Sequence, residues 1–275
     1  MRVGFIGIGN MGSLMAGNLV KKGFDVAIFD VDAERMARFG QEYGCRLAGK
    51  LLDLAVNDVI VTMLPTGQIV RQVLLGGAKG GLAGALKPGT IVIDMSSSEP
   101  LGTQKLGAAL AKRQLVLIDA PVSGGVARAQ TGKLTIMIGA NDAAAVERVR
   151  PLLLGMGESL FQTGPLGSGH AIKALNNFVA ATCFAATAEA IPIGEPSRLL
   201  ADARHEISRS GLRREAFCNP AAQSYRRGQS SAPPRGLSLV LHFLPRKCDR
   251  ARPLLHSRDG GRRPRGFPGR RTCAR

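Results

Sequence analysis

The sequence predicts an α/β domain with a mainly parallel, doubly wound sheet that is covered by helices on both faces. Short apolar runs alternate with segments of helical length up to about residue 165, a length that is ample for one buried core. The runs are apolar throughout, as in parallel strands buried on both faces. Their repeated strand–helix–strand order indicates a doubly wound arrangement.

Each predicted element follows from its own stretch of sequence. The runs that predict strands are residues 3–6, 26–29, 58–64, 90–94 and 115–119, and a further short strand is expected near Cys45. Residues 11–22 carry apolar side chains at helical spacing and are stopped by Gly23. Further helices are predicted from length and composition at residues 69–75, 102–113 and 170–190.

Composition excludes several classes of protein. No apolar run is long enough for a membrane-spanning helix, and the glycine-rich N-terminus lacks the features of a signal peptide. Cys45 and Cys183, the two cysteines before residue 196, are too few for a disulfide framework. Four scattered histidines without a CxxC motif argue against a structural zinc site. We therefore expect a reduced, cytoplasmic protein with no membrane partner.

A glycine motif lies where a dinucleotide-binding domain needs it. Residues 7–12 (GIGNMG) fit GxGxxG and connect the first predicted strand to the first predicted helix. Gly7 allows the tight turn, Gly9 lets the backbone approach a pyrophosphate, and Gly12 brings helix and strand together. Asp30 follows this helix, at the end of the second strand. A carboxylate there accepts hydrogen bonds from a ribose diol and repels a 2′-phosphate, which favours NAD, with NADP as the alternative.

Other interpretations of these residues remain open at this point. The glycines could form a turn in an α/β domain of another purpose, and Asp30 could be an exposed loop carboxylate. The sequence SGG at residues 123–125 could be a plain turn, although a Ser hydroxyl and two glycine N–H groups can also form a nest for a carboxylate. Lys173 and Asn177 are spaced i, i+4 and would project from one face of a helix, where a lysine is by default solvated.

Five motifs, taken in order, resemble the β-hydroxyacid dehydrogenases, the group that includes 3-hydroxyisobutyrate dehydrogenase and tartronate semialdehyde reductase. They are GFIGIGNMGSLMAGNLVKKGFDV (4–26), VTMLP (61–65), DMSSSEP (94–100), DAPVSGG (119–125) and GSGHAIKALNN (167–177). Their order and spacing, taken together, make the resemblance specific. It implies a Rossmann-like domain that binds NAD or NADP, followed by a long interdomain helix.

The resemblance also assigns roles to individual residues. It implies that Lys173 exchanges a proton with the substrate hydroxyl, that Asn177 orients the substrate, and that Ser123, Gly124 and Gly125 bind the substrate carboxylate. A lysine suits this role when partial burial moves its pKa toward neutrality. His170 is expected at the helix surface or as a cap. The implied cofactor-binding residues are Gly7, Gly9, Asn10, Met11, Gly12, Asp30, Leu64, Pro65 and Ser97.

The implied reaction is reversible hydride transfer between NAD(P) and a small 3-hydroxy acid of the 3-hydroxyisobutyrate or 2-hydroxy-3-oxopropionate type. No metal is required. The alternatives are a non-catalytic dinucleotide-binding protein and a nonspecific nucleic-acid binder. Because non-catalytic relatives usually lose the lysine, its presence argues against the first of these.

The segment 196–275 differs from the rest of the chain. It holds 19 of the 37 basic side chains but 5 of the 20 acidic ones, so the net charge of +17 belongs mostly to this segment. Arg, Pro and Gly dominate its composition, which predicts disorder. The predicted organisation is a dinucleotide-binding domain (1–163), the start of an interdomain helix (164–195) and a disordered tail (196–275).

The tail stands where the resemblance implies an all-α second domain. We hypothesise that it arose by a frameshift or a sequencing error. We expect it to leave dinucleotide binding intact but turnover very low, since water would enter the open pocket. The tail has no recognisable nucleic-acid module, so no dedicated nucleic-acid partner is predicted. The resemblance implies a homo-oligomer, and the altered tail argues against that assembly here.

Overall fold

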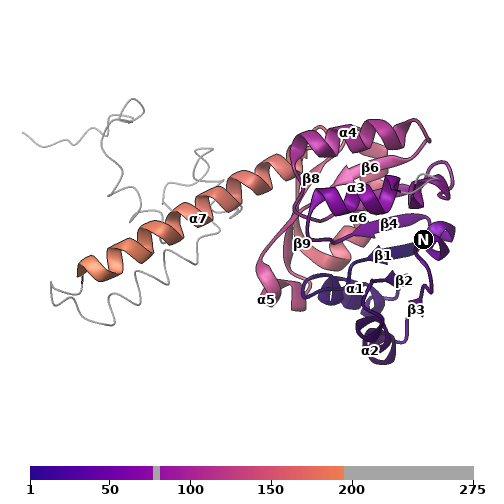
Figure 1. Ribbon diagram of the computed structural model, residues 1–275, viewed down its shortest axis with the longest axis horizontal. Helices are drawn as coiled ribbons and strands as arrows, with labels where there is room; N and C mark the ends of the chain where they lie inside the picture. The colour runs from indigo at the N-terminus through magenta and orange to yellow at the C-terminus, as the bar shows by residue number, and fades with distance from the viewer. Residues whose placement is uncertain (77–80, 195–275) are drawn as a thin grey trace, which may run out of the picture. The chain divides into compact units, whose positions relative to one another are not determined.

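The computed structural model describes residues 1–76 and 81–194, and strands and helices alternate along them (Figure 1). The strands are β1 (Arg2–Ile6), β2 (Asp25–Phe29), β3 (Arg46–Leu47), β4 (Val59–Thr62), β5 (Ile91–Asp94), β6 (Val116–Asp119), β7 (Val122–Ser123), β8 (Leu134–Gly139) and β9 (Gly157–Gly164). The α-helices are α1 (Gly12–Lys21), α2 (Ala33–Tyr43), α3 (Gly67–Leu75), α4 (Pro100–Ala111), α5 (Gly125–Gln130), α6 (Ala143–Met156) and α7 (Ser168–Gly194). Two 3₁₀ segments are η1 (Leu51–Val56) and η2 (Leu82–Gly84). The predictions for residues 196–275 lie outside the described residues.

One sheet of nine strands organises the described part of the chain. Its order is β3-β2-β1-β4-β5-β6-β8-β7, and β9 pairs with β8. Strands β1 to β6 are parallel, whereas β8 runs antiparallel to β6 and β7 and parallel to β9. The chain order reverses between β1 and β4, the point at which doubly wound sheets bind dinucleotides. The predicted fold class, an α/β domain with a Rossmann-like, mainly parallel sheet, is confirmed.

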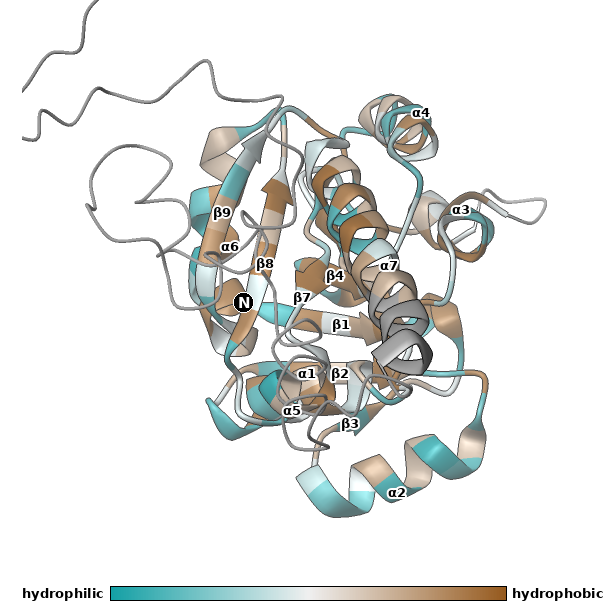
Figure 2. Ribbon diagram, turned by 90° about the vertical axis from the view of Figure 1, so that its left-hand side faces the viewer, coloured by the Kyte–Doolittle hydropathy of each residue, from teal (hydrophilic) through white to brown (hydrophobic). Residues whose placement is uncertain are grey.

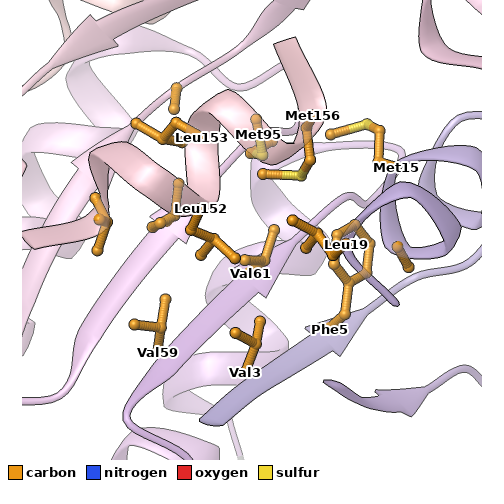
Figure 3. Close-up of a cluster of buried hydrophobic side chains, with 14 of the residues drawn as sticks. Val3, Phe5, Met15, Leu19, Val59, Val61, Met95, Leu152, Leu153 and Met156 are labelled. Carbon is orange, nitrogen blue, oxygen red and sulfur yellow. The ribbon is translucent and has the colours of Figure 1, made fainter. Parts of the chain in front are cut away.

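Side chains of the central strands alternate between two buried cores, one on each face of the sheet. Val59 and Val61 of β4 pack with α1 and α6 in the first core, which Figure 3 shows. Ile60 of the same strand packs with α3 and α4 in the second core. Because both faces are covered, every residue of β4 and β5 is buried, which explains the continuous apolar runs in the sequence.

The strands predicted from apolar runs all form, and the short strand expected near Cys45 is β3. The predicted helices correspond to α1, α3, α4 and α7. Elements that had no individual prediction are β7, β8, β9, α2, α5 and α6. No described helix is long and apolar enough to cross a membrane.

Candidate active site

Most of the residues predicted to form the site lie at or near the ends of strands, whereas Lys173 and Asn177 lie on α7. The row Ile6, Thr62, Asp94, Asp119 and Gly139 runs across five adjacent strands in register, at or near their carboxyl ends. Just beyond the strand ends lie the predicted residues of the glycine turn (7–12), Asp30, Leu64 with Pro65, Ser97, and Gly124 with Gly125; Ser123 is the last residue of β7. Ligands of open α/β sheets bind at this edge.

The three motif glycines have the surroundings that the motif requires. Gly7 has a φ of +92°, and a Cβ atom there would overlap the carbonyl oxygen of Met63. A Cβ atom on Gly12 would overlap the carbonyl oxygen of Gly7, so only glycine lets α1 start this close to the turn. A Cβ atom on Gly9 would meet nothing within 4 Å. The turn is thus packed behind Gly7 and Gly12 and open at Gly9, which fits a pyrophosphate lying against the start of α1.

Asp30 links the end of β2 to the glycine turn. Its Oδ2 accepts a hydrogen bond from the N–H of Ile8 at 2.8 Å, and its Oδ1 accepts one from the N–H of Asp32 at 3.0 Å. The side chain is only 8% exposed, so Asp30 is not an exposed loop carboxylate. A guanidinium nitrogen of Arg35 lies 3.7 Å from Oδ2. The carboxylate is therefore fixed beside the glycine turn.

The loops after β4 and β5 are tied to each other through Ser96. The hydroxyl of this buried residue accepts a hydrogen bond from the N–H of Leu64 at 2.9 Å. Pro65 and Ser97 are both exposed. Ser97 therefore stands at the surface of the strand end, while its neighbour Ser96 holds the loops together.

Residues 123–125 connect β7 to α5 through a turn in which two successive glycines have positive φ values. Ser123 is buried in β7, whereas Gly125 is exposed at the start of α5. Gly124 and Gly125 both have positive φ values, of +129° and +63°. Successive backbone N–H groups in such a turn can converge on an anion, which is the arrangement expected for a carboxylate nest.

Asp119 anchors the beginning of α7. Its Oδ1 accepts a hydrogen bond from the N–H of Gly167 at 2.7 Å, and its Oδ2 accepts one from the N–H of His170 at 2.8 Å. These are N–H groups that the first turn of a helix leaves without intrahelical partners. The carboxylate is wedged between Gly139 and Gly169, where a Cβ atom on either glycine would come within 2.8 Å of it. Burial raises the pKa of Asp119, although both N–H groups and His170 oppose that shift.

His170 is fully buried, so the expectation of a surface or capping role is wrong. Its Nε2 lies 3.1 Å from the carbonyl oxygen of Ser96, and its Nδ1 lies 2.8 Å from Oγ1 of Thr103 in α4. The carboxylates of Asp94 and Asp119 approach the ring from two strands, each at 3.8 Å. The histidine packs inward because α7 starts directly above the ends of β5 and β6.

Lys173 and Asn177 follow on the same helix, about one and two turns after His170. Lys173 is half-buried and Asn177 is exposed. Helix α7 packs against β8, β9, α4 and β6. The later positions Leu175 and Phe178 are exposed, by 55% and 70%. Lys173 thus lies on α7 between the buried His170 and these exposed positions.

Comparison with known proteins gives the family. Residues 2–164 match the family described as the NAD binding domain of 6-phosphogluconate dehydrogenase. The chain is 37% identical over 207 residues to 2-(hydroxymethyl)glutarate dehydrogenase of Eubacterium barkeri, covering 75% of this chain and 68% of that protein. It is 38% identical over 225 residues to the NAD-dependent L-serine dehydrogenase of Pseudomonas aeruginosa, covering 82% of this chain and 73% of that protein.

The chain belongs to the β-hydroxyacid dehydrogenase family. The solved structure of Mycobacterium tuberculosis 3-hydroxyisobutyrate dehydrogenase with L-serine has the same fold, with a TM-score of 0.69 and 28% identity. That match covers 90% of this chain and 81% of the other. Members of the family are NAD-dependent oxidoreductases that act on hydroxyl donors, and the predicted NAD-binding domain is confirmed.

The β-hydroxyacid dehydrogenase site contains buried groups that the sequence analysis missed. Asp94 accepts hydrogen bonds from the hydroxyls of Thr62 and Ser98, at 2.9 and 2.8 Å, and Asp119 holds α7. Both aspartates end apolar strand runs, IVID and VLID. An acidic residue at the end of an apolar run was the sequence signal from which these two buried groups could have been predicted. Among residues 1–76 and 81–194, no three His, Cys, Asp or Glu side chains cluster closely enough to hold a metal ion.

Proposed function

We propose that this protein is a dehydrogenase that transfers a hydride between NAD(P) and a small 3-hydroxy acid. The observation that carries the proposal is the anchoring of α7. Asp119 ends the strand that leads into residues 123–125, and the same side chain holds the first turn of the helix that bears Lys173. A carboxylate-binding turn and an amine are thereby tethered to one residue, which suits a substrate carrying both a carboxylate and a hydroxyl.

The proposed roles divide between binding and proton transfer. Gly7, Gly9, Asn10, Met11 and Gly12 would hold the pyrophosphate, and Asp30 would accept hydrogen bonds from the adenosine ribose. When bound, the nicotinamide supplies or accepts the hydride. We propose residues 1–163 as the dinucleotide-binding part of the chain and residues 164–195 as the segment that brings the amine.

Further residues complete the substrate side of the proposed site. Ser123, Gly124 and Gly125 would bind the substrate carboxylate, and Asn177 would orient the substrate. Lys173 would take the hydroxyl proton during oxidation and return it during reduction. Leu64, Pro65 and Ser97 would border the cofactor at the ends of β4 and β5.

The fixed position of Asp30 favours NAD, because its carboxylate would repel a 2′-phosphate. The guanidinium of Arg35 lies beside Asp30. Its positive charge would attract a 2′-phosphate, so we expect weaker but measurable binding of NADP. We further propose a slow turnover, since the sequence after residue 195 differs from the second domain that the family resemblance implies. The proposed reaction takes place at the carboxyl edge of the sheet and needs no metal.

The proposal is tested with the purified 275-residue chain and its Lys173→Ala variant. Each is mixed with a panel of small 3-hydroxy acids and NAD⁺ or NADP⁺, and reduced nicotinamide is followed by its absorbance in single-turnover mode. NADH affinity is measured by fluorescence in parallel. We expect the variant to bind NADH as the parent does and to lose roughly 100-fold or more in hydride-transfer rate, the usual contribution of an acid/base group.

Two outcomes would contradict the proposal. Equal hydride-transfer rates in the parent and in Lys173→Ala would remove the lysine from the mechanism. Absence of NADH binding by the parent would remove the dinucleotide itself. Lys112→Ala, in the segment after α4, is the matched control and should leave both the rate and the affinity unchanged.

A further inference from the structure

His170 lies in a buried cluster that the proposed chemistry does not use. Its imidazole is completely enclosed, and the two strand-end carboxylates of Asp94 and Asp119 flank it at 3.8 Å each. The two aspartates are direct register partners on β5 and β6. Each is held by other donors, so neither can turn away from the ring without losing hydrogen bonds.

The hydrogen-bond partners of His170 constrain its protons. Nε2 faces the carbonyl oxygen of Ser96, which can only accept, so Nε2 carries a proton. Nδ1 faces the hydroxyl of Thr103, whose oxygen also lies 3.1 Å from the carbonyl oxygen of Glu99. Either Nδ1 or the Thr103 hydroxyl can be the donor of their 2.8 Å hydrogen bond. Both ring nitrogens are thus engaged, one with the loop after β5 and one with α4.

We infer that His170 is a positioning residue, a buried imidazole clamped between Asp94 and Asp119 that holds the first turn of α7 and thereby sets the position of Lys173. This inference rests on the proposed role of Lys173. The clamp joins three elements, because Asp94 comes from β5, Asp119 from β6, and Thr103 from α4. Lys173 lies one turn further along the same helix, so movement of that turn would move the amine.

Titratable side chains reach the ring from two strands. From β5 and β6 it faces the carboxylates of Asp94 and Asp119, each at 3.8 Å. Glu99, at the start of α4, is paired with Arg71. On the helix that carries the ring, the nearest cation along the sequence is Lys173. The hydrogen-bond partners of the ring nitrogens, Ser96 and Thr103, do not titrate.

The first experiment measures the protonation of His170 in the full chain. Long-range ¹H–¹⁵N spectra record the histidine rings, of which the chain has four. A triple variant with His205, His242 and His256 changed to Gln leaves the signal of His170 alone. We expect Nε2 to carry a proton, because it faces the carbonyl oxygen of Ser96. An Nε2 without a proton would overturn the inference.

The second experiment asks whether His170 acts on Lys173. Lysines are converted to ¹³C-dimethyl-lysines, the Lys173 signal is identified by its loss in Lys173→Ala, and its titration midpoint is measured. In His170→Gln, which keeps a donor for Ser96 but does not fill the place of the ring between Asp94 and Asp119, we expect the midpoint to move by about half a unit or more, because release of the first turn changes the surroundings of the amine. The same exchange at His205 should change nothing.

These results separate the inference from the function on which it rests. An unchanged Lys173 midpoint in a folded His170→Gln variant would overturn the positioning role, whatever the activity. If Lys173→Ala retains full hydride transfer, the proposed function fails, while the midpoint still decides whether His170 acts on the amine. If His170→Gln does not fold, the ring spectrum of the triple variant alone decides, because an Nε2 without a proton contradicts the clamp and a protonated Nε2 supports it.

Discussion

Gly9 and Gly12 belong to one motif, but their surroundings differ, and this difference can be tested residue by residue. Gly12 has the carbonyl oxygen of Gly7 where a methyl group would go, whereas Gly9 has nothing within 4 Å. A side chain at Gly12 would therefore disturb the fold, and one at Gly9 would instead occupy space that the dinucleotide needs.

We predict that Gly12→Ala lowers the free energy of unfolding by about 1–3 kcal/mol or more, because an inserted methyl group must displace backbone. Gly9→Ala should leave that free energy within about 0.5 kcal/mol of the parent. It should nevertheless weaken NADH binding at least tenfold, or by about 1.4 kcal/mol. Urea unfolding and NADH fluorescence titrations measure the two effects. A Gly9→Ala variant that binds NADH normally would place the pyrophosphate elsewhere.

At the residue scale, the sequence located the local motif well and the buried cluster poorly. The glycine turn and Asp30 lie close together in the sequence, and each is explained by its own stretch of backbone. His170 is different, since its burial depends on Asp94 and Asp119, which lie far earlier in the chain. A single histidine on a helix carries no local signal for such partners, so only the folded arrangement reveals its position.

At the scale of an element, α6 illustrates what one cap contributes. Asp142 precedes the helix, and its Oδ1 accepts a hydrogen bond from the N–H of Ala145 at 3.0 Å. The helix then buries Val149 and Leu152 against the sheet. The cap satisfies one of the N–H groups that a helix start leaves open.

We predict that Asp142→Ala lowers the free energy of unfolding by about 1 kcal/mol, the usual cost of losing an N-cap. Asp142→Asn should stay close to the parent, since asparagine caps about as well as aspartate. Urea unfolding at neutral pH, followed by far-UV circular dichroism, measures both variants. Equal stability of Asp142→Ala and the parent would mean that the hydrogen bond to Ala145 contributes nothing net.

Elements differed in how well the sequence predicted them. Buried central strands such as β4 and β5 are apolar on both faces and therefore stand out. Helix α2 buries only Phe39 and is largely hydrophilic in Figure 2, so its apolar side is narrow. Strand β9 lies at the edge and mixes exposed with partly buried residues, and β7 is two residues long. Short, edge or surface elements obtain their regular structure from neighbours, and this tertiary contribution leaves little pattern in the sequence.

At the scale of the whole molecule, Asp58 ties the chain terminus to the sheet in a pH-dependent way. Its carboxylate accepts a hydrogen bond from the N–H of Arg2 at 2.8 Å, and the Arg2 guanidinium lies 3.6 Å away. The backbone N–H of Arg2, helped by the nearby charge of its side chain, holds the pKa of Asp58 below the ordinary 3.8. A lowered pKa in the folded state means that the ionised carboxylate stabilises the fold above pH 3.8, and that this contribution disappears as the pH falls through the folded pKa.

We predict that Asp58→Asn destabilises the protein at neutral pH and that its difference from the parent shrinks as the pH is lowered to about 2. The measurement is urea unfolding at a series of pH values. Glu158→Gln, which removes an exposed carboxylate of β9, should follow the pH dependence of the parent. A difference between Asp58→Asn and the parent that stays constant from neutral to acid pH would show that the carboxylate charge plays no part.

The carboxylate of Asp119, which sits between Gly139 and Gly169, has a consequence for how this protein family can diversify. As long as residue 119 keeps a carboxylate, alanine or anything larger at 139 or 169 would collide with it. A smaller residue at 119 would lift that restriction at 139, whereas at 169 the backbone carbonyl oxygen of Met137 would still lie 2.4 Å from a Cβ atom. Residues 119 and 139 should therefore change as a pair among related sequences while 169 stays glycine, and frequent single exchanges at 139 beside a retained aspartate would contradict this steric constraint.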